Sequence, residues 1–231
     1  NPQNLRGLPL TRTELRNLGQ IKASRRHPGD TPGMDAAPAP SHPGHGPAAA
    51  PPGDLAIWFF ILAELLAFGV FFAAYAFARA HDVELFDSMQ QTLDRQAGAL
   101  NTVLLISGSA CVARAVEAVG RSRSATGARW LLAGIACGGG FLVVKGFEYA
   151  DKFGAGINLS TNTFYMFYLS LTFFHFMHVI LGMVILVALW VKTRQGAYGP
   201  ADMNGIESGA AYWHMVDLVW IVLFPLVYVM R

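Results

Sequence analysis

The chain has 231 residues, of which 53% are hydrophobic and 14% are charged. This balance excludes an ordinary soluble domain and predicts an integral membrane protein. The formal net charge of +2 is too small to indicate a nucleic-acid partner.

The first 53 residues differ in composition from the rest and are rich in Pro, Gly and Ala. They hold few apolar side chains to offset the entropy of ordering, so we expect a disordered cytoplasmic tail. No apolar core followed by a small-residue cleavage site is found in this segment, so no secretory signal peptide is predicted. We interpret His42 and His45 as part of the solvated tail rather than as metal ligands.

Residues 54–231 contain five long apolar stretches, at 55–78, 99–119, 130–149, 163–191 and 209–230. A helix needs roughly 20 residues to cross a bilayer core of about 30 Å. The sequence therefore predicts an all-α membrane domain, in which five transmembrane helices form a bundle.

The distribution of basic residues predicts the orientation of this domain. Twelve of the 17 Lys and Arg residues fall in the tail and in segments 114–129 and 192–194, which five spans place on one side. By the positive-inside rule that side is cytoplasmic, and the C-terminus is external. An aromatic belt at the cytoplasmic span ends is expected from four tryptophans: Trp58, Trp130, Trp190 and Trp213.

The first connection, 79–98, is acidic and longer than the others. Leu85, Met89 and Leu93 recur there at intervals of four residues, which predicts a short amphipathic helix at the membrane interface.

Two features predict how the later spans pack. Gly134 and Gly138 form a small-xxx-small pair, which lets a neighbouring helix approach closely. Pro225 lacks a backbone donor, so we expect the last helix to kink near Ile221.

Ionisable side chains inside the spans are the first candidates for function, because an unpaired charge in lipid costs several kcal/mol. Glu64 lies about 14 Å from the start of its span, near the midplane. Its carboxyl group is expected to be protonated or paired, either as a proton relay or as a hydrogen bond between helices. Lys145 and Glu148 lie toward the external end of the third span, where Lys145 is expected to snorkel outward and Glu148 to neutralise it.

Three imidazole groups also fall within spans. His175 and His178 share a helix face, but two histidines are too few for a transition-metal site. His214 and Asp217 stand three residues apart, so Asp217 is expected to orient or charge His214, or the two form a structural pair.

The chain holds no complete active site of its own. Three intramembrane histidines cannot supply all the ligands of a haem-copper centre, and no CxxCH, phosphate loop or nucleophile elbow occurs. We interpret Cys111 and Cys137 as buried hydrophobes that form neither a disulfide nor a metal site.

Five stretches of sequence occur in the order found in one known family: 58–72, 101–108, 147–149, 175–182 and 212–220. On these stretches the chain, from Asp54 to Met230, resembles subunit III of the haem-copper (cytochrome c) oxidases. The longest members have seven spans, and this chain corresponds to a five-span form that lacks the first two. Residues 162–168 look most like the accessory protein of bacterial nitric oxide reductase.

The resemblance implies an accessory subunit of the bacterial inner (plasma) membrane that binds no cofactor, beside a catalytic subunit that holds haem and copper or iron. It also implies phospholipid binding and support of proton uptake, with proton-path or structural roles for Glu64, Glu148, His214 and Asp217. Lipid or interhelical contacts are expected from His175, His178, Trp58 and Trp213. Two alternatives remain open, namely a transient assembly factor for nitric oxide reductase and a proton-coupled transporter. The odd number of spans and the absence of internal repeats weigh against the transporter.

Overall fold

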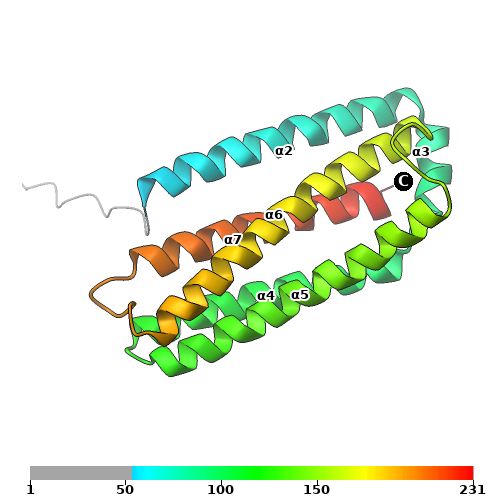
Figure 1. Ribbon diagram of the computed structural model, residues 1–231. Coiled ribbons are helices and arrows are strands. Elements are labelled where there is room, and N and C mark those ends of the chain that lie inside the picture. Colours follow the sequence, from blue (N-terminus) through cyan, green and yellow to red (C-terminus); the bar gives the residue numbers. More distant parts are fainter. Residues whose placement is uncertain (1–53, 231) are drawn as a thin grey trace, which may run out of the picture. The chain divides into compact units, whose positions relative to one another are not determined.

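We analysed a computed structural model, which describes residues 54–230. The expected disordered tail, with His42 and His45, lies outside the described residues. Every regular element from 54 to 230 is a helix (Figure 1). In chain order the elements are α2 (Leu55–His81), α3 (Val83–Gln90), α4 (Arg95–Gly120), α5 (Ser124–Gly154), α6 (Thr163–Arg194), α7 (Asn204–Phe224) and the π-helical segment η1 (Pro225–Val229).

Five of these helices are long and apolar enough to cross a membrane, which confirms the predicted spans. Several of their ends extend beyond the apolar stretches, and polar side chains cap the start of α2, α4 and α6. Asp94, for example, accepts hydrogen bonds from the backbone N–H groups of Gln96 and Ala97, so α4 begins four residues before the predicted span. Asn162 caps α6 in the same way.

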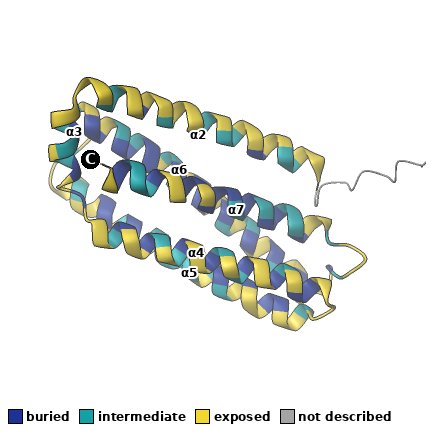
Figure 2. Ribbon diagram, turned by 180° about the vertical axis from the view of Figure 1, so that it is seen from behind, coloured by how far each residue is buried: buried dark blue, intermediate teal, exposed yellow. Residues whose placement is uncertain are grey.

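The long helices alternate in direction, so their ends gather in two groups, which we call the Leu55 end and the His81 end (Figure 1). α4 packs along α5, whereas α2 packs against α6 and α7. In the most apolar 18-residue stretch of each span, 56% of the residues are buried in the last span, which α7 and η1 form, against 11% in α2. α7 is therefore the central helix, and α2 is peripheral and largely exposed (Figure 2).

The predicted close approach at the glycines is confirmed, although the two face different helices. A Cβ atom added at Gly134 would lie 3.1 Å from the Cγ2 atom of Val112 on α4. One added at Gly138 would lie 2.7 Å from the Cη2 atom of the Trp213 ring on α7. Because these two glycines have no side chains, α4 can approach α5 closely at Gly134 and α7 can do so at Gly138.

Trp213 is not at a span end, contrary to the prediction. α7 begins at Asn204, so Trp213 lies about 14 Å along the helix, at 1% exposure. It fills the space left by glycines of α5 and α6 rather than a belt position. Trp58, Trp130 and Trp190 lie within two turns of the Leu55 end of their helices, as expected, and Trp58 is half-buried.

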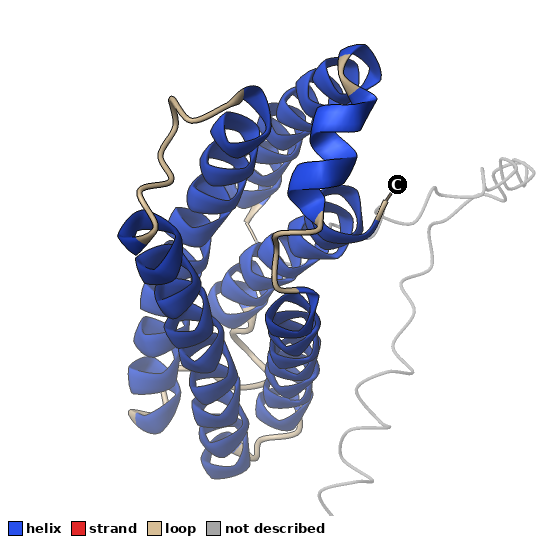
Figure 3. Cartoon of the chain, turned by 90° about the vertical axis from the view of Figure 1, so that its right-hand side faces the viewer, coloured by secondary structure: helices blue, strands red, loops and turns tan. Residues whose placement is uncertain are grey.

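The predicted short helix in the first connection exists as α3, but its buried face is offset by one residue. Phe86 and Gln90 are fully buried, whereas Leu85 and Met89 are only half-buried. The helix packs onto α2, α6 and η1, and these contacts select its inner face. It lies at the His81 end, which faces the viewer in Figure 3.

Pro225 changes the type of helix rather than acting one turn earlier. α7 stays α-helical past Ile221 to Phe224, and η1 begins at Pro225. The N–H group of Met230 donates to the Pro225 carbonyl at 2.9 Å, a five-residue spacing. The side chain of Gln90 on α3 then donates to the Val227 carbonyl at 3.0 Å, which ties η1 to the bundle.

Candidate functional site

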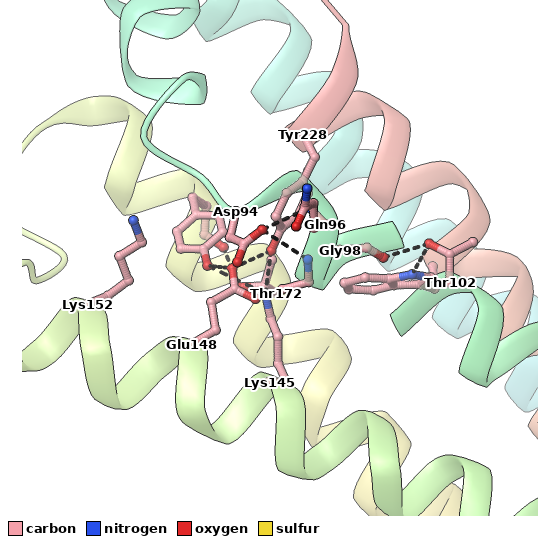
Figure 4. Close-up of polar contacts among 12 residues, drawn as sticks. Asp94, Gln96, Gly98, Thr102, Lys145, Glu148, Lys152, Thr172 and Tyr228 are labelled. Atoms are coloured by element: carbon pink, nitrogen blue, oxygen red, sulfur yellow. Dashed lines mark hydrogen bonds and ion pairs between the residues drawn. The ribbon is translucent and has the colours of Figure 1, made fainter. Parts of the chain in front are cut away.

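A buried polar cluster joins α5, α6 and η1 near the His81 end (Figure 4). The Nζ atom of Lys145 lies 3.1 Å from Oε2 of Glu148 and 2.5 Å from the hydroxyl of Tyr228. The hydroxyls of Tyr168 and Tyr228 both donate to Oε1 of Glu148, and the hydrogen bond from Tyr228 is 2.7 Å long. We call these four side chains the Lys145 cluster.

The expectation that Lys145 snorkels outward is wrong, because its side chain is 0% exposed. The expected neutralisation by Glu148 is confirmed. Lys145 stays inside because two tyrosines, 23 and 83 residues away, supply the polar partners that water would otherwise provide.

Sequence reasoning missed both tyrosines. A signal was present, since a tyrosine buried within an apolar span needs a partner for its hydroxyl. The same rule applies to Trp220, whose indole N–H donates to the Thr102 hydroxyl at 3.0 Å.

Glu64 and His178, which the sequence treats separately, form one pair between α2 and α6. The Nε2 atom of His178 lies 3.0 Å from Oε2 of Glu64, and the side chains are 10% and 21% exposed. The Nδ1 atom of His178 lies 2.8 Å from the Phe174 carbonyl, which can only accept, so Nδ1 carries a proton. Another proton must therefore be shared between Nε2 and the carboxylate, whichever atom holds it.

His175 does not join His178 at this pair. It is 0% exposed, and neither ring nitrogen has a hydrogen-bond partner. Its ring stacks on Trp220 at 5.3 Å between centroids and meets the edges of Phe68 and Phe141. Of the two kinds of contact expected for His175, with lipid or between helices, its ring makes the second.

The hydrogen bond of His214 goes to Ser109, and Asp217 acts on His214 through its charge and also lies close to Ser109. The Nδ1 atom of His214 lies 2.6 Å from the hydroxyl of Ser109 on α4. Asp217 is 7% exposed, and its Oδ1 atom has no hydrogen-bond partner. Ser109 belongs to α4, which packs directly on α7. Among residues 54–230 no three His, Cys, Asp or Glu side chains are arranged to hold a metal ion.

These features define the class of the protein, a multi-pass membrane protein built as a helix bundle around buried polar contacts. Residues 44–231 match the family described as cytochrome c oxidase subunit III, and the chain belongs to that family.

Several curated relatives agree with this assignment. A cytochrome c oxidase subunit 3 of Thermostichus vulcanus is 31% identical over 76% of this chain and 86% of its own length. The cytochrome c oxidase subunit 3 of a Synechocystis species is 31% identical over 74% of this chain and 72% of its own length. A haem-copper oxidase subunit I+III of Aeropyrum pernix is also 31% identical, over 75% of this chain and 22% of its own length.

Proposed function

We propose that the chain is a non-catalytic accessory subunit of a bacterial respiratory haem-copper complex, resident in the inner (plasma) membrane. The observation that carries the proposal is the family match, which spans all five described transmembrane helices. The name of the Aeropyrum pernix relative joins subunits I and III in one polypeptide. The partner proposed for this chain is a catalytic subunit, which holds haem and copper, or haem and iron in a nitric oxide reductase.

The exposed face of α2 supports such a partnership. Large apolar side chains recur along it at intervals of three or four residues: Phe59, Leu62, Leu66 and Val70. They form one continuous stripe on the least buried helix. A stripe of this kind suits a contact with the membrane part of a partner subunit or with acyl chains.

Support of proton uptake is the second part of the proposal. The Glu64–His178 pair holds a shared proton and is partly exposed on the face between α2 and α6. A proton held at the edge of the bundle suits transfer to or from a neighbouring subunit.

Phospholipid binding is the third part, and a cleft of about 410 Å³ at the Leu55 end supports it. Arg129 and Arg194 line this cleft, and neither has an acidic partner in the described part of the chain. The Arg194 guanidinium lies 5.0 Å from the centre of the Trp190 ring. A lipid phosphate between the two arginines, with Leu132 along its acyl chains, fits this lining.

Gentle solubilisation followed by native electrophoresis tests the assignment. A resident subunit is expected to comigrate with the catalytic subunit and its haem, whereas an optical spectrum of the isolated chain should show none. Comigration with a nitric oxide reductase would assign the parent complex to denitrification, and with an oxygen-reducing enzyme to aerobic respiration. Loss of the chain from every mature complex would favour the transient assembly factor, and stoichiometric haem on the isolated chain would overturn the proposal.

A further inference from the structure

The Lys145 cluster has an opening toward the His81 end, which the basic residues predict to be external. A cavity of about 380 Å³ lies between the start of α4 and the end of α5. Its polar lining comes from Thr92, Asp94, Glu148, Asp151 and Lys152. Glu148 is thus both a member of the buried cluster and a wall of the cavity.

The other polar groups of the cavity are already engaged or lie toward water. Asp94 caps α4, and the Lys152 ammonium donates to the Thr92 carbonyl at 2.8 Å. Asp151 is exposed, whereas the Glu148 side chain is 6% exposed. Because Glu148 lies about 9 Å along α5 from Gly154, it forms the inner end of a short path from water.

The charge of Lys145 does not depend on Glu148 alone. Its Nζ atom donates to the hydroxyls of Tyr168 and Tyr228, and it lies 5.2 Å from the ring centre of Tyr149 and 5.6 Å from that of Trp220. Attraction between a desolvated cation and one such ring is worth up to about 2 kcal/mol. The rings of Tyr149 and Trp220 and the hydroxyls of Tyr168 and Tyr228 therefore stabilise the ammonium even when the carboxyl group beside it is neutral.

This arrangement gives the cluster two charge states. With Glu148 ionised, the ammonium and the carboxylate cancel. When Glu148 takes a proton from a hydronium ion in the cavity, one O–H bond forms, a water molecule is left, and the cluster carries one positive charge. The tyrosine hydroxyls can turn from donor to acceptor, so the neutral carboxyl group keeps a partner.

We propose that Glu148, with Lys145, Tyr168 and Tyr228, is a proton-exchange site that binds one proton reversibly from the aqueous phase at the His81 end. This proton-exchange site goes beyond the proposed function and does not involve Glu64. The inference is the same whether the parent complex is an oxidase or a nitric oxide reductase. The titratable and charged groups that face the cluster are Asp94 before α4, Tyr149, Asp151 and Lys152 on α5, and His175 on α6.

Infrared difference spectroscopy of the intact complex in lipid vesicles, recorded between acidic and alkaline pH, tests this site. The wild type should show a protonated-carboxyl C=O band that grows as the pH falls and is lost in Glu148→Gln. Glu117→Gln is the matched control, because Glu117 is an exposed carboxylate that pairs with Arg121 at 2.7 Å, and it should keep the band. An identical band in wild type and Glu148→Gln would overturn the proposal.

Two further measurements keep the test decisive if Glu148→Gln fails to assemble. Tyr228→Phe preserves the ring and removes one hydrogen bond to Glu148, so the band should persist at a shifted frequency. An unshifted band would contradict its assignment to this cluster. In sealed vesicles of one orientation, the band should respond only to the pH on the side of the His81 end, and a response from the other side alone would also overturn the proposal.

Discussion

Glu64 on α2 and His178 on α6 stand 114 residues apart in the chain and 3.0 Å apart in space. The pair joins α6 to α2, the least buried helix, whose apolar packing against the bundle is sparse. A single charge-assisted contact therefore contributes more to holding α2 than it would in the tightly packed pair of α4 and α5. α2 is joined to the bundle by polar chemistry as well as by packing.

Replacing Glu64 by Leu is expected to lower the free energy of unfolding by about 1–3 kcal/mol. The substitution leaves the Nε2 atom of His178 without a partner in a mostly buried place. Glu64→Gln should cost less, because an amide N–H can still donate to Nε2. Unfolding by denaturing detergent in mixed micelles measures both variants.

Glu117→Ala is the control for this comparison, since that carboxylate is exposed and its ion pairs lie at the surface. It should change the same free energy by at most about 1 kcal/mol. Equal losses in Glu64→Leu and Glu117→Ala would mean that the pair does not hold α2.

Gly138→Ala is expected to destabilise the bundle by about 1–3 kcal/mol, because the new methyl group would lie 2.7 Å from the enclosed Trp213 ring. The neighbouring Gly139→Ala is a matched control on the same helix. A Cβ atom there meets nothing within 4 Å, and alanine favours the helix by up to about 1 kcal/mol. Opposite signs in the detergent unfolding of the two variants are the expected result, and equal effects would contradict the packing argument.

The apolar spans were predictable from the sequence because span length and composition are local properties of the chain. The close approach at Gly134 and Gly138 was predictable for the same reason. The helix ends were only partly predictable. Asp94 extends α4 through a polar cap that a hydropathy pattern does not register, whereas α6, which Asn162 caps, begins at the predicted residue.

The partners of the buried polar groups could not be predicted, because each comes from a distant part of the chain. The distance of Lys145 from the span end favours snorkelling, whereas the convergence of Tyr168 and Tyr228 keeps it inside. The i, i+3 spacing of His214 and Asp217 favours their pairing, whereas Ser109 on a neighbouring helix binds His214. Spacing along one helix describes a face, and only the packing of helices decides what meets that face.

Ser109→Ala tests whether the hydrogen bond between Ser109 and His214 stabilises the bundle. His214 loses the partner of its Nδ1 atom, so the free energy of unfolding should fall by about 0.5–1.5 kcal/mol. Ser107→Ala, at an exposed position two residues earlier, is the control and should have little effect. If the two variants unfold alike in detergent titrations, the Ser109–His214 hydrogen bond does not stabilise the bundle.

Gln90→Leu is expected to loosen η1 and, with it, the position of Tyr228. The amide of Gln90 donates to the carbonyl of Val227 at 3.0 Å and to that of Leu226 at 3.4 Å. A leucine of similar size removes both donors and leaves the buried Val227 carbonyl without this partner, at a cost of about 1–3 kcal/mol. Hydrogen exchange of the backbone amides in Pro225–Val229 should therefore speed up, while Gln91→Leu, at an exposed neighbouring position, should leave it unchanged. Unaltered exchange in Gln90→Leu would show that the π-helical segment is held by its own hydrogen bonds and by the Lys145 cluster alone.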